Sequence, residues 1–287
     1  MRLKDKVAIV TGGATGIGEA IVKKFSSEGA TIVIVGLQDD PVEEVVNEVK
    51  QEYNTPVIGL IKNVARKDEA QEVIEETVSA FGRVDILISN ASILPQYIEL
   101  DKNDDDGFED ILDANIRSTY YMVKAALPEL RKTRGNIVAS GSIAGINGLP
   151  ESNPYAGSKA FIHAFIKGVA IEQGKYGIRA NVVAPGPIDT EMTRKEVGGM
   201  NEEAEKTIVT STVFGRRGTT EEAANVYCFL ASDEASYVTA SVYNVDNGIS
   251  MAIGPVGEKA EESLKEYPEG KLNIRHAVVR EESYGIK

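Results

Sequence analysis

The sequence predicts an α/β fold in which one parallel sheet is covered by helices on both faces. Short β-branched runs alternate with helix-length amphipathic segments through the first third of the chain. A parallel strand pair needs a crossover, usually a helix, so this alternation indicates βαβ units. The 287 residues, 42% hydrophobic and 26% charged, are enough for one large domain with a buried core. We therefore predict a single, three-layer, doubly wound domain.

The predicted elements follow one another in a regular order. The segment from Ile17 to Glu28 has helical spacing and ends at Gly29, a residue typical of helix C-termini. Asp39, Asp40 and Pro41 open the helix after the second strand. The polar stretch from Glu191 to Gly218 interrupts the rhythm, and we expect a mobile lid there. The predicted strands are Val7 to Thr11, Thr31 to Val35, Val57 to Ile61, Ile86 to Ser89, Asn136 to Ala139, Arg179 to Ala184 and Val242 to Asp246, and the predicted long helices are Phe108 to Leu130 and Tyr155 to Tyr176.

Composition excludes several classes of protein. A formal net charge of -13 without a Lys/Arg cluster disfavours nucleic acid as a partner. No apolar run approaches the roughly 20 residues of a membrane span, and Met1 is not followed by a signal-peptide core. The single Cys228 cannot form an intramolecular disulfide, so we predict a reducing, cytoplasmic location. The acidic run Asp104 to Asp106 lacks the alternating ligands and glycine of an EF-hand loop, and we predict no metal.

Tyr155 and Lys159 form a pair suited to proton transfer. A free phenol has a pKa of about 10, so tyrosine is a poor acid or base at neutral pH unless its phenolate is stabilised. Residues four apart on a helix share one face. One positive charge at ~4 Å in an effective dielectric of ~20 is worth roughly 4 kcal/mol, or about three pKa units. We therefore predict that Lys159 lowers the pKa of the Tyr155 phenol towards 7.

A glycine cluster follows the first predicted strand. Gly12, Gly16 and Gly18 stand where a helix begins, with the spacing GxxxGxG rather than GxGxxG. Glycine lets the backbone approach a pyrophosphate, which the helix N-terminus then holds through free N–H groups. A tight turn is the alternative explanation, but the position between a strand and a helix favours dinucleotide binding.

Two further clusters lie at the ends of predicted strands. Ser89-Asn90-Ala91-Ser92 ends the fourth strand, where small residues would leave room for a ligand at the carboxyl edge of the sheet, although a simple loop explains them equally well. Asn63 ends the third strand and could hydrogen-bond an adenine edge or merely cap the following turn.

In this order, over residues 3 to about 253, the motifs resemble the short-chain dehydrogenase/reductase family, in its branch of roughly 250-residue enzymes. The resemblance implies a Rossmann-type domain over residues 1–253 that binds NAD or NADP, and it leaves 254–287 as a C-terminal extension. Besides the tyrosine, lysine and glycine motifs it rests on Arg179-Ala180-Asn181, Pro185-Gly186-Pro187-Ile188-Asp189-Thr190, Phe229-Leu230-Ala231-Ser232 and Val245-Asp246-Asn247-Gly248.

The family's catalytic tetrad matches Asn115, Ser142, Tyr155 and Lys159 in this chain. The resemblance implies that Tyr155 exchanges a proton with the substrate oxygen as hydride moves between a secondary alcohol or ketone and the nicotinamide. Ser142 would donate a hydrogen bond to that oxygen, and its interval of thirteen residues to Tyr155 selects it over Ser140. Lys159 would also bind the nicotinamide ribose, and Asn115 would hold a water linked to the lysine. The expected cofactor contacts are Gly12, Thr15, Gly16, Ile17, Gly18, Asn63, Val64, Asn90, Ala91, Tyr155, Lys159, Pro185, Gly186, Ile188 and Thr190.

The position that usually decides between NAD and NADP departs from the family's pattern. Gly36 stands where an NAD enzyme of the family usually has aspartate, and Leu37 and Thr15 supply no basic residue for a 2'-phosphate. A missing carboxylate at residue 36 favours NADP. The acidic residues of the following turn and helix favour NAD, and the balance tilts to NAD; they are Asp39, Asp40, Glu43 and Glu44.

Several expectations concern partners and alternative functions. By resemblance, the helices Phe108 to Leu130 and Tyr155 to Tyr176 pack against symmetry mates in a homotetramer or homodimer. His163 continues the Tyr155 and Lys159 row and is expected to pack or to contact a subunit. The extension is either inert or reaches across a subunit interface. A catalytically silent dinucleotide-binding regulator or scaffold is the alternative function, and an epimerase or dehydratase would need a larger substrate domain. The substrate alcohol or carbonyl stays open among polyol, sugar, steroid and acyl carbonyl.

Overall fold

The computed structural model describes residues 1–94, 97–190 and 202–272. Seven parallel strands form one sheet in the order β3-β2-β1-β4-β5-β6-β7. The chain therefore winds first towards one edge and then, from β4 onward, towards the other, so that the strand order reverses next to β1. The strands are β1 (Val7–Thr11), β2 (Thr31–Gly36), β3 (Val57–Ile61), β4 (Ile86–Ser89), β5 (Asn136–Ser140), β6 (Arg179–Pro185) and β7 (Val242–Val245).

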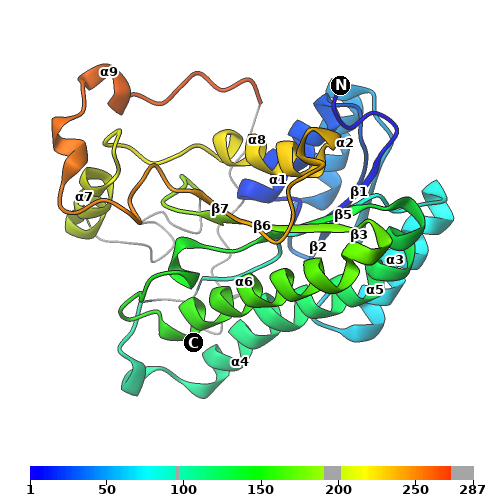
Figure 1. The fold of residues 1–287 in the computed structure, drawn as a ribbon, viewed down its shortest axis with the longest axis horizontal. Coiled ribbons are helices and arrows are strands. Elements are labelled where there is room, and N and C mark those ends of the chain that lie inside the picture. Colours follow the sequence, from blue (N-terminus) through cyan, green and yellow to red (C-terminus); the bar gives the residue numbers. More distant parts are fainter. Residues whose placement is uncertain (95–96, 191–201, 273–287) are drawn as a thin grey trace.

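Helices cover both faces of the sheet, as Figure 1 shows. One face packs on α1 (Gly16–Ser27), α2 (Val42–Tyr53) and α8 (Thr220–Ala231), which share a buried cluster with the side chains of that face. The other packs on α3 (Lys67–Phe81), α5 (Ser118–Thr133) and α6 (Asn153–Gln173). The core strands are continuous apolar runs because both faces are covered, and the predicted three-layer α/β class is confirmed.

The predicted strands agree with the structure to within one residue at each end. The predicted helix from Phe108 to Leu130 is different. It consists of α4 (Asp105–Ile111), a π-helical segment over Leu112–Arg117, and α5. Asn115 lies in the π segment, and such segments are frequent at functional sites.

Two short helices lie together at one end of the molecule, and the chain that follows the second of them runs back towards α8 (Figure 1). They are α7 (Glu202–Ser211) and α9 (Glu262–Lys265). Gly257 is buried where a Cβ would come within 2.3 Å of the Thr212 carbonyl oxygen. The backbone N–H groups of Lys271 and Leu272 donate to Glu221 of α8 at 2.7 and 3.3 Å. The extension therefore contacts the rest of its own chain at Gly257 and at residues 271 and 272. Residues 191–201 of the predicted lid and 273–287 of the extension lie outside the described part.

Candidate active site

The turn after β1 is built around its glycines. Gly12 and Gly16 have φ of +59° and +52°, a region in which a side chain would be strained. A Cβ on Gly18 would lie 1.8 Å from the Gly12 carbonyl oxygen. Thr15 is the N-cap of α1, but its side chain makes no hydrogen bond to the helix. The first backbone N–H groups of α1 therefore lack a capping side chain. This turn has the cradle and the free helix N-terminus that a pyrophosphate requires.

Asn90 joins the ends of β1 and β4. Its amide donates to the carbonyl oxygens of Thr11 and Gly12, both at 3.2 Å. In the other direction, the Thr11 hydroxyl accepts from the backbone N–H groups of Asn90 at 3.0 Å and Ala91 at 3.1 Å. Asn90 and Ala91 therefore hold the glycine turn against the sheet edge, so the cluster after β4 is more than a simple loop.

Ser140 and Tyr227 extend this network, and sequence reasoning missed both. The Ser140 hydroxyl donates to Asn90 Oδ1 at 2.9 Å and lies 2.6 Å from the Tyr227 hydroxyl. Tyr227 is fully buried on α8. Nothing local distinguished it within its apolar run, because its partner lies 87 residues away. A buried tyrosine hydroxyl nevertheless usually finds a hydrogen-bond partner, which was the one available signal.

Tyr155 lies in the first turn of α6, which begins at Asn153 with Pro154 beside it. The side chain is partly buried, and burial raises the pKa of the Tyr155 phenol to about 12, against a smaller lowering by a hydrogen bond from Ser142. The predicted lowering of this pKa by Lys159 is not what the structure shows. Desolvation disfavours the phenolate more strongly than its neighbours stabilise it.

Lys159 is buried one turn beyond Tyr155. Its Nζ donates to the Ser140 carbonyl oxygen at 3.0 Å and lies 5.5 Å from the centroid of the Tyr155 ring. Burial lowers the pKa of Lys159 to about 7. Because an ammonium with that pKa is only partly charged at neutral pH, it stabilises a neighbouring phenolate less than the sequence argument assumed.

Ser142 and His163 meet beside the lysine. The Ser142 backbone N–H donates to His163 Nε2 at 3.4 Å, and the Ser142 Oγ accepts from Ala144 N at 3.1 Å. A Cβ on Gly141 would lie 2.3 Å from His163 Nε2. Burial and then the charge of Lys159 lower the pKa of His163 to about 4, so the imidazole is neutral at pH 7. His163 therefore packs under the Ser142 loop, as one of the two sequence expectations had it.

The side chain of Asn115 hydrogen-bonds Ile93 and Ser158 rather than Lys159. Its amide oxygen accepts from Ile93 N at 2.8 Å, and its amide nitrogen donates to Ile93 O at 3.1 Å and Ser158 Oγ at 3.0 Å. These bonds occupy both amide hydrogens, so the side chain ties the segment after β4 to α6. The expected water at Asn115 stays a prediction, and the side-chain amide has no hydrogen left to donate to it.

The segment after β6 lies across the glycine turn. Gly186 packs where a Cβ would meet Asp246 at 2.6 Å, and Ile188 and Thr190 are buried. The Thr190 methyl lies 3.5 Å from the position of a Cβ on Gly16. The structure therefore brings the end of this segment, predicted to contact the nicotinamide, next to the start of α1.

The ends of β2 and β3 hold the residues that the sequence predicted to lie near the adenosine. Asn63 is exposed, and its side-chain oxygen accepts from Ala65 N at 3.0 Å, which is the capping role that the sequence left open. The neighbouring Val64 is buried. At the end of β2, the Asp40 carboxylate accepts from Leu37 N at 2.6 Å, and a Cβ on Gly36 would lie 2.9 Å from the same oxygen. Asp40 thus fills the space that a side chain at residue 36 would take.

Together these elements place the glycine turn, the Tyr155 phenol and the segment of residues 185–190 at the carboxyl edge of the sheet, beside the point where the strand order reverses. Within the described ranges, no cluster of three or more His, Cys, Asp or Glu could hold a metal ion. No helix in those same ranges is long and apolar enough to cross a membrane.

Comparisons with known proteins agree with this geometry. A family model described as enoyl-(acyl carrier protein) reductase matches residues 12–250. The 3-oxoacyl-[acyl-carrier-protein] reductase of Thermotoga maritima is 36% identical over 250 residues, which cover 87% of this chain and 99% of the relative. The 3alpha-hydroxysteroid dehydrogenase of Mediterraneibacter gnavus is 36% identical over 86% of this chain and 97% of its own length.

Solved structures give the same result. Levodione reductase aligns with a TM-score of 0.84 and 28% identity over 88% of this chain and all of its own. An NADH-dependent reductase responsible for alginate metabolism aligns with a TM-score of 0.77 and 29% identity, over 86% of this chain and 98% of its own.

Proposed function

The chain belongs to the short-chain dehydrogenase/reductase family and is an NAD(P)-dependent oxidoreductase acting on alcohols and ketones, and from this premise we propose which residues carry the reaction. The observation that carries the proposal is the convergence of Tyr155, Ser142 and Lys159 at the sheet edge next to the glycine turn. The nicotinamide supplies or accepts the hydride when bound.

Tyr155 exchanges the proton with the substrate oxygen. With a pKa of about 12 the phenol is protonated at neutral pH and can donate to a carbonyl oxygen as that oxygen gains charge. Ser142, which lies close enough to Tyr155 to lower the pKa of its phenol, donates to the same oxygen. Lys159, with a pKa of about 7, gains or loses its own proton easily near neutrality and so can return a proton towards the phenol.

The cofactor is held by the cradle that the backbone provides. The turn of residues 12–18 and the uncapped start of α1 would take the pyrophosphate. The segment of Pro185, Gly186, Ile188 and Thr190, in which Ile188 and Thr190 are buried, would lie against the nicotinamide. Asn63 and Val64 would border the adenine, and Asn115 would serve by fixing the segment after β4 against α6.

Replacing Tyr155 with Phe tests the catalytic assignment. The variant removes one hydroxyl and leaves the ring, so we expect turnover to fall at least about 100-fold while NAD binding stays within a few-fold of wild type. A panel of alcohols and carbonyls with either cofactor gives the rate, and a thermal-shift titration gives the binding. Undiminished turnover in Tyr155→Phe would sink the assigned role.

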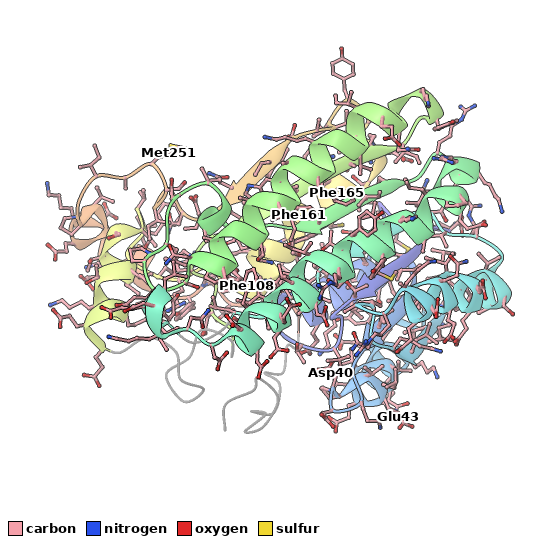
Figure 2. The ribbon with its side chains drawn as sticks, turned by 90° about the horizontal axis from the view of Figure 1, so that it is seen from below. Asp40, Glu43, Phe108, Phe161, Phe165 and Met251 are labelled. Atoms are coloured by element: carbon pink, nitrogen blue, oxygen red, sulfur yellow. The ribbon has the colours of Figure 1, made fainter. Side chains whose placement is uncertain are left out.

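NAD is the proposed cofactor, because Asp40 places a carboxylate at the end of β2 where residue 36 has none. Asp40 and Glu43 lie at the same end of the molecule (Figure 2), and their charges would repel a 2'-phosphate. A relative described as NADH-dependent supports the same choice. Titrations of Asp40→Asn and of the matched Glu43→Gln with NAD and NADP test it. We expect Asp40→Asn to reduce the ratio of NAD affinity to NADP affinity more than Glu43→Gln does. Tighter binding of NADP than of NAD by the wild-type protein would overturn the proposal of NAD as cofactor.

We further propose a homodimer or homotetramer that uses the face of α4, α5 and α6. Phe161 stacks on Phe165 with ring centroids 5.4 Å apart, and Tyr120 lies against Phe165 at 5.9 Å. Phe108, 42% exposed, lies near them on α4 (Figure 2). An aromatic face of this kind on paired helices fits a second copy of the same face. Light scattering of Phe161→Glu/Phe165→Glu against wild type measures it, and an unchanged mass would contradict it.

The catalytic domain is proposed to end near residue 253, where β7 and its following turn are complete. The cytoplasmic location stays a prediction.

A further inference from the structure

Arg217 lies directly beside the segment proposed to face the nicotinamide. The next residue, Gly218, pairs in a parallel bridge with Ile188. Asp189 N donates to Gly218 O at 2.8 Å, and Gly218 N donates to Pro187 O at 3.0 Å. These backbone bonds fix the start of the Arg217 side chain, which is 5% exposed, next to residues 187–189.

Two of the three guanidinium nitrogens of Arg217 donate hydrogen bonds to Glu205. Its Nε donates to Glu205 Oε1 at 2.7 Å, and its Nη2 donates to the other oxygen of the same carboxylate. Its Nη1 is buried and has no hydrogen-bond acceptor among the residues that the structure describes. A buried hydrogen-bond donor on a cation destabilises the folded state when it has no acceptor, so its presence calls for a functional explanation. Arg216 differs, because both of its terminal nitrogens bond acceptors and only its inner Nε stays unpaired.

The region around Arg217 is continuous with the Tyr155 end of the site. Tyr97 is electrostatically coupled to both residues: burial raises the pKa of Tyr97 and the charge of Arg217 lowers it, while Tyr97 raises the pKa of Tyr155. The backbone agrees, since Ile98 N donates to Glu151 O at 2.7 Å, four residues before Tyr155. Arg217, Tyr97 and Tyr155 therefore border one region at the carboxyl edge of the sheet.

The charges near Arg217 select the kind of ligand. Glu205 is paired with the guanidinium, and the carboxylate of Asp189 lies near enough to raise the pKa of Arg217 as well. One cation faces two carboxylates, so a further anion would be repelled. The donor on Nη1 suits a neutral oxygen instead.

We propose that Arg217 Nη1 donates a hydrogen bond to a neutral substrate oxygen, a hydroxyl or carbonyl separate from the oxygen that reacts at Tyr155. The substrate class is then an alcohol or ketone with a second oxygen function, such as a diol, hydroxyketone or diketone. Monofunctional apolar alcohols and anionic substrates are poorer. This inference rests on the proposed function.

A matched substrate panel tests the inference. Cyclohexanol, the 1,3- and 1,4-cyclohexanediols and 3-hydroxycyclohexanecarboxylate differ only in the second group. A site that hydrogen-bonds a substrate oxygen rejects the analogue without it, so wild type should show a kcat/KM about 10- to 100-fold higher for at least one diol than for cyclohexanol. The carboxylate should gain nothing.

Two variants and a control assign the effect to Nη1. In Arg217→Lys and Arg217→Met the ratio of diol to cyclohexanol should fall towards one, and lysine shows that charge alone does not restore it. Arg216→Lys, which disturbs the neighbouring ion pair with Glu222, should keep the wild-type ratio. If Arg217→Met fails to fold, Arg217→Met/Glu205→Leu removes both partners of the ion pair and serves in its place.

The outcomes are distinguishable. Turnover of the whole panel without a diol preference, or a preference that survives in Arg217→Met, overturns the inference and leaves the proposed function standing. A preference for the carboxylate also overturns it. If wild type binds NAD yet turns over no member of the panel or of the wider alcohol and carbonyl screen, the proposed function fails and this inference with it.

Discussion

The glycine-turn end of the site and the substrate end differ in the kind of polar group that is buried there. At the glycine-turn end, a chain of hydrogen bonds between uncharged groups reaches the backbone of the turn. Its members are Thr11, Asn90, Ser140 and Tyr227. At the substrate end, the buried groups are charged and incompletely paired. Lys159 has a pKa lowered to about 7. Arg217 keeps a buried Nη1 without an acceptor in the described part of the chain.

The difference separates what stabilises the fold from what is kept for chemistry. Neutral, satisfied groups cost little to bury, whereas a buried cation is destabilising unless it is fully paired. The glycine-turn end therefore contributes stability and a shape that many substrates can share. On the assignments proposed above, the substrate end holds groups whose burial cost is retained for their function.

The largest expected effect comes from breaking the glycine-turn end. In Gly18→Ala the new Cβ would lie 1.8 Å from the Gly12 carbonyl oxygen, so the turn must open. We expect no detectable NAD binding and a loss of stability of about 1–3 kcal/mol. Calorimetric titration and thermal unfolding measure both. Retention of wild-type NAD affinity would show that this end tolerates side chains after all.

Lys159→Met should make the substrate end more stable while it inactivates the enzyme. The lowered pKa of Lys159 means that this residue destabilises the folded state by several kcal/mol at neutral pH, which the variant would relieve. The variant also loses the hydrogen bond to Ser140, which costs about 1 kcal/mol. We therefore expect a net gain of about 2–4 kcal/mol, measured by urea unfolding.

The pH dependence gives an independent check on that prediction. Between about 7 and the ordinary lysine pKa of 10.5, the unfolded state binds more protons at Lys159 than the folded state. Lys159 should therefore add an upward slope with pH to the free energy of unfolding of wild type across this window. Lys159→Met should lose that slope, and an equal slope in both proteins would contradict the lowered pKa.

Gly257→Ala tests how far the extension belongs to the substrate end. A Cβ there would lie 2.3 Å from the Thr212 carbonyl oxygen and 2.8 Å from Gly215 Cα. We expect undocking of the extension, with a loss of about 1–3 kcal/mol and faster hydrogen exchange in residues 202–215. NAD affinity should not change. Gly270→Ala is a milder comparison in the same extension, since its Cβ would meet Glu221 Oε2 at 3.1 Å and Leu272 O at 3.8 Å, and we expect a smaller effect there.

The smallest effect is expected from Gly157→Ala, the counterpart of Gly18→Ala. A Cβ at Gly157, which is exposed in α6, would have no atom within 4 Å apart from its chain neighbours and the backbone of its own helix. Alanine should stabilise the helix by about 0.5–1 kcal/mol and leave NAD affinity unchanged. A loss of stability would mean that α6 is packed more closely than its exposure indicates.

Much of the fold could be predicted because its signals are local. The strands from Val7 to Thr11 and from Val57 to Ile61 have the predicted ends, since β-branched runs bounded by turn residues mark them. The helix through Asn115 could not be predicted in detail. Its π segment accompanies bonds from Asn115 to Ile93 and Ser158, and these partners are distant in sequence.

The site shows the same division. The sequence alone determined the α/β class, the glycine turn and the row of Tyr155 and Lys159, because each depends on spacing along a strand, turn or helix. Tertiary structure alone decided the pKa values of that pair, the network through Ser140 and Tyr227, and the unpaired donor of Arg217. The physical reason is that burial and hydrogen bonding depend on which distant segments meet, and no local pattern encodes the desolvation that results.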